Sequence, residues 1–266
     1  MKNVDMTSFQ IGGGGNRTHR RAFTLAEVLI TLGVIGIVAS LTLPSLIGRY
    51  KEKEYIAGLK KAYTTINQAL LLAINEYGTV DNWCERPLNK NTCSQTMMER
   101  ISKYLKVTNV CTKQDGKCFS KRYNNQSSFF TNSRYEIKTT DKTAYNFTAL
   151  CGDGYERNWC KTNVNDFTSG GFYYNCGYIY VDINGPEKPN ETGKDAFVFK
   201  IFKNGIRPGG ISADGIWTES FKDSCLQKKQ TSFTGRLWCA GWALHNENMD
   251  YLHCDDLSWK GKTKCK

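Results

Sequence analysis

The sequence lacks the short motifs that mark common catalytic sites. It contains no GxSxG, HExxH or P-loop pattern, and no GxGxxG pattern that follows a strand. The glycine tract at residues 12–15 has no strand before it, which excludes a phosphate-binding loop there. No CxxC pair occurs, so neither a zinc ribbon nor a thioredoxin-like redox site is indicated. These absences predict a protein that is not an enzyme.

Cysteine is absent before Cys84, although the chain contains 11 cysteines. In an exported domain this density indicates disulfides rather than metal or redox chemistry. The odd count leaves one thiol free or paired between chains. Local spacing suggests the pairs Cys84–Cys93, Cys111–Cys118, Cys151–Cys160, Cys225–Cys239 and Cys254–Cys265, and leaves Cys176, although sequence does not fix the connectivity.

One long apolar run is present, at residues 25–47, and Glu27 is its only charge. About 20 apolar residues suffice for a helix to cross a bilayer, so this run is long enough. A carboxylate is costly in hydrocarbon and needs a partner there, and Glu27 is therefore a candidate functional residue.

Residues 20–44 are RRAFTLAEVLITLGVIGIVASLTLP. This segment resembles the N-terminus of type IV pilins and type II secretion pseudopilins. Those precursors have a basic leader, a small residue, Phe-Thr-Leu-x-Glu and an apolar helix with an internal proline. The matching residues are Ala22, Phe23, Thr24, Leu25, Glu27 and Pro44. The resemblance implies that a prepilin peptidase cuts between Ala22 and Phe23 and methylates the new amine. Ala22 departs from the glycine that is usual at this position.

Cleavage before Phe23 would place a positive amine one helical turn from Glu27. In low dielectric the pairing of opposite charges is far stronger than in water. The amine of a neighbouring subunit could therefore satisfy Glu27 and set the register between subunits. Gly33 and Gly36 add small surfaces for close helix approach. Pro44 would kink or locally melt the helix, or else mark its end.

Arg20 and Arg21 before an apolar run also resemble a twin-arginine export signal. Cleavage near Ser40 would then release the rest of the chain. The alternative function is a membrane-anchored or exported ligand-binding domain that does not polymerise and that could bind DNA or polysaccharide. The apolar run is longer than a signal-peptide core, which favours the pilin-like interpretation.

Beyond the apolar run, the hydrophobic residues recur at helical spacing up to Tyr77, and Gly78 is a suitable stop. One helix is therefore expected from about Leu25 to Tyr77. The sequence divides into a leader at residues 1–22, a transmembrane and polymerisation helix at 23–48, an amphipathic helix at 49–78 and a cysteine-rich globular head at 79–266.

The head is predicted to contain antiparallel strands at residues 129–137, 144–150, 172–183 and 196–203. The last of these is expected to be buried on both faces, and Asn204-Gly205 predicts a hairpin after it. Residues 82–118 are predicted to form a disulfide-tied loop with a short helix near residues 95–105. The fold class is α+β: a long N-terminal helix packed on an antiparallel, disulfide-rich sheet.

The head also contains a polar loop at residues 182–195, similar to the Asp-x-Asn-Gly…Pro-Asn…Gly…Asp loop of some large pilin-like proteins. Its oxygen side chains could bind calcium, and Asp182, Asn184, Asn190 and Asp195 are the candidate ligands. The alternative is a rigid turn in which these residues satisfy backbone amides. No other cofactor is indicated.

The net charge is +11, which could attract DNA, acidic polysaccharide or anionic lipid. The lysines are scattered and form no nucleic-acid motif, so solubility is the simpler explanation. The sequence thus predicts a structural filament subunit, minor or pseudopilin-like. Its partners would be other pilins, the prepilin peptidase and an inner-membrane assembly platform. The precursor is expected in the bacterial inner membrane and the product in a periplasmic or extracellular filament.

Overall fold

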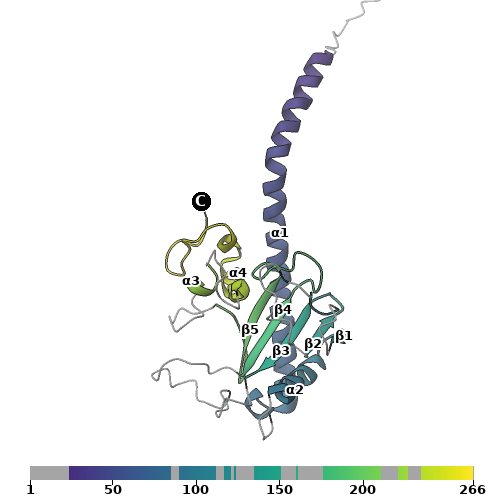
Figure 1. The fold of residues 1–266 in the computed structure, drawn as a ribbon, viewed down its shortest axis with the longest axis vertical. Coiled ribbons are helices and arrows are strands. Elements are labelled where there is room, and N and C mark those ends of the chain that lie inside the picture. The colour runs from purple at the N-terminus through teal and green to yellow at the C-terminus, as the bar shows by residue number, and fades with distance from the viewer. Residues whose placement is uncertain are drawn as a thin grey trace, which may run out of the picture. The chain divides into compact units, whose positions relative to one another are not determined.

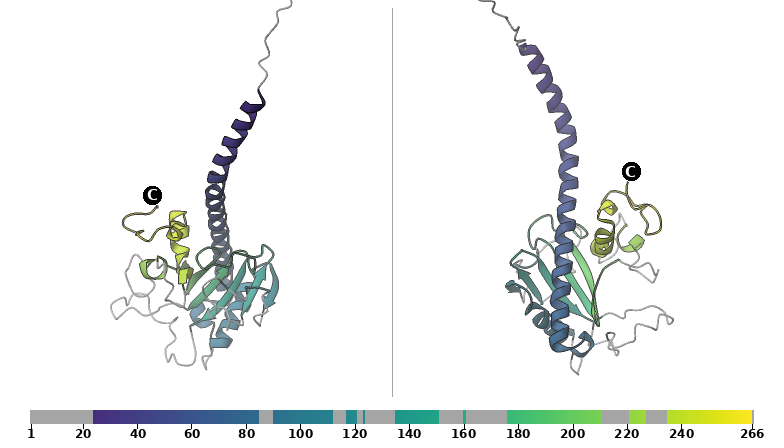
Figure 2. Two further views of the ribbon diagram at one scale, coloured as in Figure 1. Left: turned by 45° about the horizontal axis from the view of Figure 1, so that its top comes forward. Right: turned by 180° about the vertical axis from the view of Figure 1, so that it is seen from behind.

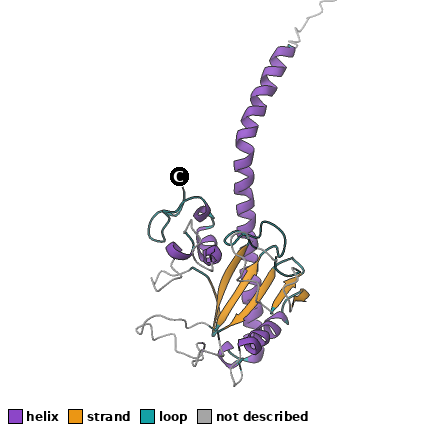
Figure 3. Cartoon of the chain, viewed as in Figure 1, coloured by secondary structure: helices purple, strands orange, loops and turns teal. Residues whose placement is uncertain are grey.

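A computed structural model describes residues 24–84, 90–111, 117–120, 123, 135–150, 160, 176–210, 221–226 and 235–265. The described elements are helices, six strands and short 3-10 helices, and the head is built around the sheet that the strands form (Figures 1 and 3). The predicted leader, Ala22, Phe23 and Cys151 lie outside the described residues, as do the first parts of the strands predicted at 129–137 and 172–183.

Helix α1 (Leu25–Tyr77) confirms the prediction of one continuous helix. Pro44 lies inside it, so the alternative that Pro44 marks the helix end is wrong. The helix stops at Gly78, whose φ of 77° is the left-handed conformation that glycine adopts at helix ends. The chain falls into two compact units, one ending at Ile47 and the other beginning at Gly48, and α1 contributes residues to both.

The sheet is a six-stranded antiparallel meander in which each strand pairs with the next along the chain. Its strands are β1 (Val107–Cys111), β2 (Glu136–Thr139), β3 (Ala144–Ala149), β4 (Gly177–Asp182), β5 (Ala196–Phe202) and β6 (Gly205–Pro208). The α+β prediction is therefore confirmed. Within the second unit, α1 lies across one face of this sheet (Figure 2).

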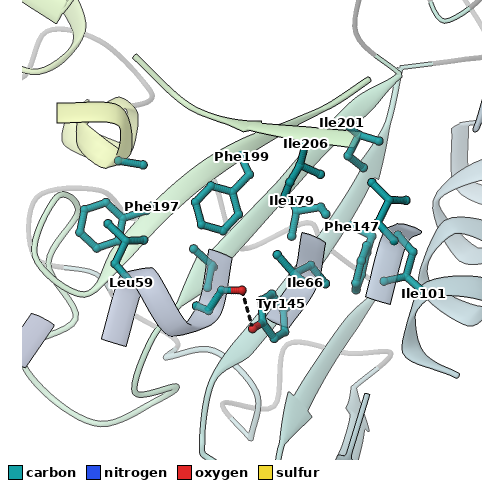
Figure 4. Packing of buried hydrophobic residues seen from close by; sticks show 14 of the residues in the cluster. Leu59, Ile66, Ile101, Tyr145, Phe147, Ile179, Phe197, Phe199, Ile201 and Ile206 are labelled. Atoms are coloured by element: carbon teal, nitrogen blue, oxygen red, sulfur yellow. Dashed lines mark hydrogen bonds between the residues drawn. The ribbon is translucent and has the colours of Figure 1, made fainter. Parts of the chain in front are cut away.

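The core of the head forms between the buried stripe of α1 and that face of the sheet. Leu59 and Ile66 of α1 are fully buried, as are Phe197, Phe199 and Ile179 of the sheet (Figure 4). Each such side chain contributes roughly 1.5–3 kcal/mol relative to an exposed one. Hydrogen bonds also cross this boundary: the Tyr145 hydroxyl donates to the carbonyl of Ala62 of α1 at 3.3 Å, and the Tyr63 hydroxyl of α1 donates to the carbonyl of Ile206 at 3.3 Å. The amphipathic stripe predicted from the sequence is thus the face that the sheet covers.

Strand β5 is buried on both faces over most of its length, as its sequence predicts, and only Lys200 and Phe202 are partly exposed. The predicted hairpin also forms, but Phe202 pairs with Gly205, so the two loop residues are Lys203 and Asn204 rather than Asn204 and Gly205.

Two features of the preceding segment differ from the prediction. The short helix is α2 (Lys90–Ser102), which begins earlier than expected and packs against β3. Residues 107–111, predicted as loop, form the edge strand β1. Pairing with β2 makes this segment a strand, and such a non-local contact leaves little trace in the local sequence.

The described residues of the C-terminal part of the head include short helical elements beside β5. They are α3 (Phe221–Ser224), η3 (Gly235–Cys239), α4 (Ala240–Asn246) and η4 (Asp250–Leu252). The Phe221 and Trp242 rings stack at 4.1 Å between centroids, and Trp259 lies edge-on to Trp242 at 5.1 Å. Phe221, Trp242 and Trp259 therefore form one aromatic cluster that packs this region together.

The disulfides confirm three predicted pairs and overturn two. Cys111–Cys118, Cys225–Cys239 and Cys254–Cys265 form as expected. Cys160 bonds Cys176, so the predicted Cys151–Cys160 pair and the unpaired Cys176 are wrong. Cys93 is disulfide-bonded whereas Cys84 is a thiol, which excludes the predicted Cys84–Cys93 pair. Spacing favoured the neighbour in sequence, but the fold brings other cysteines within bonding distance.

Candidate functional site

The part of α1 that precedes Gly48 exposes almost all of its apolar side chains. Leu25 is 78% exposed and Leu41 is 74% exposed, and the other large apolar side chains of the segment are exposed by two fifths or more. A surface of this kind is stable only against hydrocarbon or other protein. By length and composition, and within the described residues, α1 is the one helix that could cross a membrane.

Thr24 and Glu27 form a reciprocal cap at the start of this helix. The Thr24 backbone N–H and hydroxyl both donate to Glu27 Oε2, at 2.8 and 2.9 Å. The Glu27 backbone N–H donates in return to Thr24 Oγ1 at 3.2 Å. This capping box satisfies two N–H groups that otherwise have no partner at a helix start. The carboxylate that the sequence marks as lone is therefore bound to its own helix end.

Three further predicted assembly residues lie along the same segment. A Cβ atom added at Gly33 or Gly36 would meet nothing within 4 Å, so both glycines leave open helix surface. They are three residues apart and share one side of the helix. Pro44 lies on the same exposed segment. The predicted processing residues, Ala22 and Phe23, lie immediately before the described residues.

The second candidate site is the loop between β4 and β5. Asp182 and Asp195 are completely buried at its two ends. Asp182 accepts hydrogen bonds from the Tyr123 hydroxyl and, at 3.1 Å, from the backbone N–H of Asn184. Asp195 accepts from the backbone N–H groups of Asn190 and Glu191, both at 2.7 Å. These bonds fix the loop as a turn held by two internal carboxylates.

The two carboxylates are poorly compensated electrostatically. Burial, and then the charge of Asp195, raise the pKa of Asp182 well above its ordinary value. Burial raises the pKa of Asp195 to about 6, although the N–H groups of Glu191 and Asn190 oppose the shift. Their ionised forms are thus disfavoured in the folded head.

The four predicted calcium ligands lie in this one loop, but much of their hydrogen-bonding capacity is used internally. The side-chain Nδ2 groups of Asn184 and Asn190 donate to the backbone carbonyls of Lys188 and Pro186, at 3.0 and 3.4 Å. The side-chain carbonyls of the same two residues are buried and accept no hydrogen bond from the residues that the structure describes. Among the residues that the structure describes, no three His, Cys, Asp or Glu side chains gather into a metal-binding group. The hydrogen bonds favour the rigid-turn interpretation, and calcium binding stays a prediction.

Two residues of these sites escaped the sequence analysis. Thr24 was matched to a family pattern but not identified as a cap, although Thr-x-x-Glu before an apolar run is a capping-box signature. Tyr123, the partner of Asp182, had no sequence signal, because the two residues meet only through the fold.

Comparison with known families agrees with the first site. A prokaryotic N-terminal methylation motif matches residues 17–43, which include the cap, Gly33 and Gly36. The N-terminal segment is accordingly that of the type IV pilin and pseudopilin class, a substrate of the prepilin peptidase. The model of a family of unknown function, DUF6613, matches residues 45–231, more than half of the chain, and the chain belongs to that family. No curated protein and no solved structure matches the chain.

Proposed function

We propose that this protein is a structural subunit, minor or pseudopilin-like, of a type IV pilus or a type II secretion-type filament. The observation that carries the proposal is the contrast within α1. Its residues after Gly48 bury a stripe against the sheet, whereas its residues before Gly48 expose a continuous apolar surface. The methylation motif coincides with the exposed part. A surface of this kind suits both storage in a bilayer and packing against helices of other subunits.

The proposed sequence of events begins with a membrane-inserted precursor. The prepilin peptidase cleaves between Ala22 and Phe23 and methylates the Phe23 amine. The inner-membrane assembly platform then moves the subunit into the filament, where helices pack through the side that carries Gly33 and Gly36. Pro44 removes one backbone hydrogen bond and lets the helix adjust during this transfer. The Phe23 ammonium of one subunit pairs with Glu27 of its neighbour.

The proposal includes no catalytic role, because the head serves as a structural part of the filament. The product is a periplasmic or extracellular filament. Nucleic acid is not required as a partner, since a net charge of +11 also serves to keep the protein soluble.

N-terminal mass analysis of the protein purified from cells tests the processing step. The expected mature chain begins with methylated Phe23. A chain that retains its first residues, or that begins near Ser40, would overturn the proposal, and the second outcome would support the exported, non-polymerising alternative.

Co-purification with sheared filaments tests assembly. Glu27→Ala is expected to enter the membrane normally but to be lost from the filament fraction. Glu54→Ala is the matched control, because Glu54 is an exposed glutamate of the same helix within the head unit. If Glu27→Ala is recovered in filaments at the level of the unsubstituted chain, the proposed contact is wrong.

A further inference from the structure

The cap at the start of α1 uses only one of the two oxygens of Glu27. Both bonds from Thr24 end on Oε2, and among residues 24–84 and the other described parts of the chain no donor contacts Oε1. Hydrogen bonds from the start of its own helix therefore hold the carboxylate in one orientation through Oε2, and Oε1 can still accept a hydrogen bond.

The Thr24 hydroxyl differs from the other hydroxyls of the segment. Those of Thr31, Ser40 and Ser45 donate to the backbone carbonyl three residues earlier, at 2.9, 2.7 and 2.9 Å, and that of Thr42 donates four residues back at 3.0 Å. These are the local bonds that buried serine and threonine usually make in helices. Within residues 24–47, Thr24 is the hydroxyl that reaches a carboxylate.

We propose that Thr24 is a positioning residue for assembly: its hydroxyl holds the Glu27 carboxylate at the helix start and leaves Oε1 turned to a neighbouring subunit's ammonium. This inference rests on the proposed function. Before assembly, the cap supplies hydrogen bonds that hydrocarbon cannot, and the positive end of the helix dipole adds to them. During assembly, the same cap limits the carboxylate to one rotamer, which lowers the entropy lost when the intersubunit pair forms.

The test compares substitutions in the full chain, in cells that process and assemble it. Thr24→Val keeps the shape and the backbone N–H but removes the hydroxyl, and Thr24→Ser restores a hydroxyl. Thr31→Val is the matched control, because it removes a hydroxyl from the same segment without touching Glu27. Each variant is measured for membrane level, for the mass of its N-terminus and for recovery in sheared filaments.

We expect Thr24→Val to be inserted and processed normally but to lose about tenfold in filament recovery, the effect of one hydrogen bond to a charged group. Thr24→Ser and Thr31→Val should assemble like the unsubstituted chain. In the Glu27→Ala background, Thr24→Val should cause no further loss, because Thr24 acts through Glu27.

Three outcomes would overturn the inference alone: normal recovery of Thr24→Val while Glu27→Ala fails, failure of Thr24→Ser to restore assembly, or a Thr24→Val chain that stays uncleaved. Normal recovery of Glu27→Ala would instead overturn the proposed intersubunit contact itself, so the two failures are distinguishable.

Discussion

Asp182 and Asp195 are buried side chains at the two ends of one loop, and the backbone between them is closed by a hydrogen bond from the N–H of Ile183 to the carbonyl of Asp195 at 2.9 Å. The loop they enclose contacts three other parts of the head. Gly58 of α1 lies against the Ile183 side chain. Tyr123 donates to Asp182, and the Tyr251 hydroxyl donates to the carbonyl of Gly193 at 2.7 Å. The loop therefore joins α1, Tyr123 and the C-terminal elements.

The stability of the head should rise as the pH falls from 7 to about 5. The folded-state pKa of Asp195 is about 6, against an ordinary value of 3.8, and that of Asp182 is also raised. In this window the folded state binds more protons than the unfolded state, so the free energy of unfolding falls as pH rises. We expect a gain of about 1–3 kcal/mol between pH 7 and pH 5, measured by thermal unfolding of the processed chain in mild detergent.

Asp195→Asn should reduce this pH dependence, because it removes one of the titrating groups. Asp256→Asn is the control, since Asp256 is an exposed carboxylate that pairs with Lys262 at 2.6 Å. Its pKa is lowered by that contact, so its contribution is lost only at more acidic pH. A melting temperature that falls steadily from pH 7 to pH 5 would contradict the interpretation of the two aspartates.

Calcium should have little effect on this loop. Both oxygens of Asp182 and both oxygens of Asp195 already accept hydrogen bonds from the protein. We expect the melting temperature to be the same with millimolar calcium and with a chelator, because a ligand stabilises a fold only when it binds the folded state. A rise with calcium that is abolished in Asp182→Asn would show instead that the unpartnered carbonyls of Asn184 and Asn190 belong to a metal site.

The extent of the long helix could be predicted because its signals are local. The apolar run, the stripe that follows it and the stop at Gly78 are all periodic or neighbouring features. The same holds for β5, whose apolar residues occupy both faces. The candidate assembly residues were found for the same reason, since they form one short contiguous pattern.

Features set by distant contacts could not be predicted. Cys176 directly precedes β4 and bonds Cys160. No rule of sequence spacing shows that the partner of Cys160 is Cys176 rather than Cys151. Strand β1 exists through its pairing with β2, and Tyr123 reaches Asp182 across a separation of 59 residues. In each case the deciding interaction is tertiary.

Gly193→Ala should destabilise the head. Gly193 has a φ of 80°, which an L residue rarely adopts, and an added Cβ would lie 2.5 Å from Cβ of Arg236. We expect a loss of about 1–3 kcal/mol and a melting temperature lower by several degrees. Gly205→Ala is the matched control, because its nearest neighbour would be Asn67 Oδ1 at 3.9 Å. Equal melting temperatures for the two variants would contradict the close packing at Gly193.

Peptide mapping without reduction should recover Cys160 linked to Cys176. The two Cα atoms lie 4.3 Å apart, whereas the spacing in sequence favoured Cys151 as the partner of Cys160. The peptides Cys111–Cys118, Cys225–Cys239 and Cys254–Cys265 serve as internal controls, since sequence and structure agree on them. Recovery of a Cys151–Cys160 peptide from the native protein would contradict the Cys160–Cys176 disulfide.

Cys84 should react slowly with alkylating reagents in the native protein. Burial raises the pKa of its thiol to about 11 from an ordinary 9.0, despite the opposing charge of Arg100. Because the thiolate is the nucleophile, alkylation at pH 8 should be about a hundredfold slower than that of a model thiol. Unfolding in denaturant without reductant should restore the ordinary rate and label Cys84 rather than Cys93, which is disulfide-bonded. Labelling of native Cys84 at the rate of a model thiol would show that its thiol is not shielded from water, and labelling of Cys93 would overturn its assignment as disulfide-bonded.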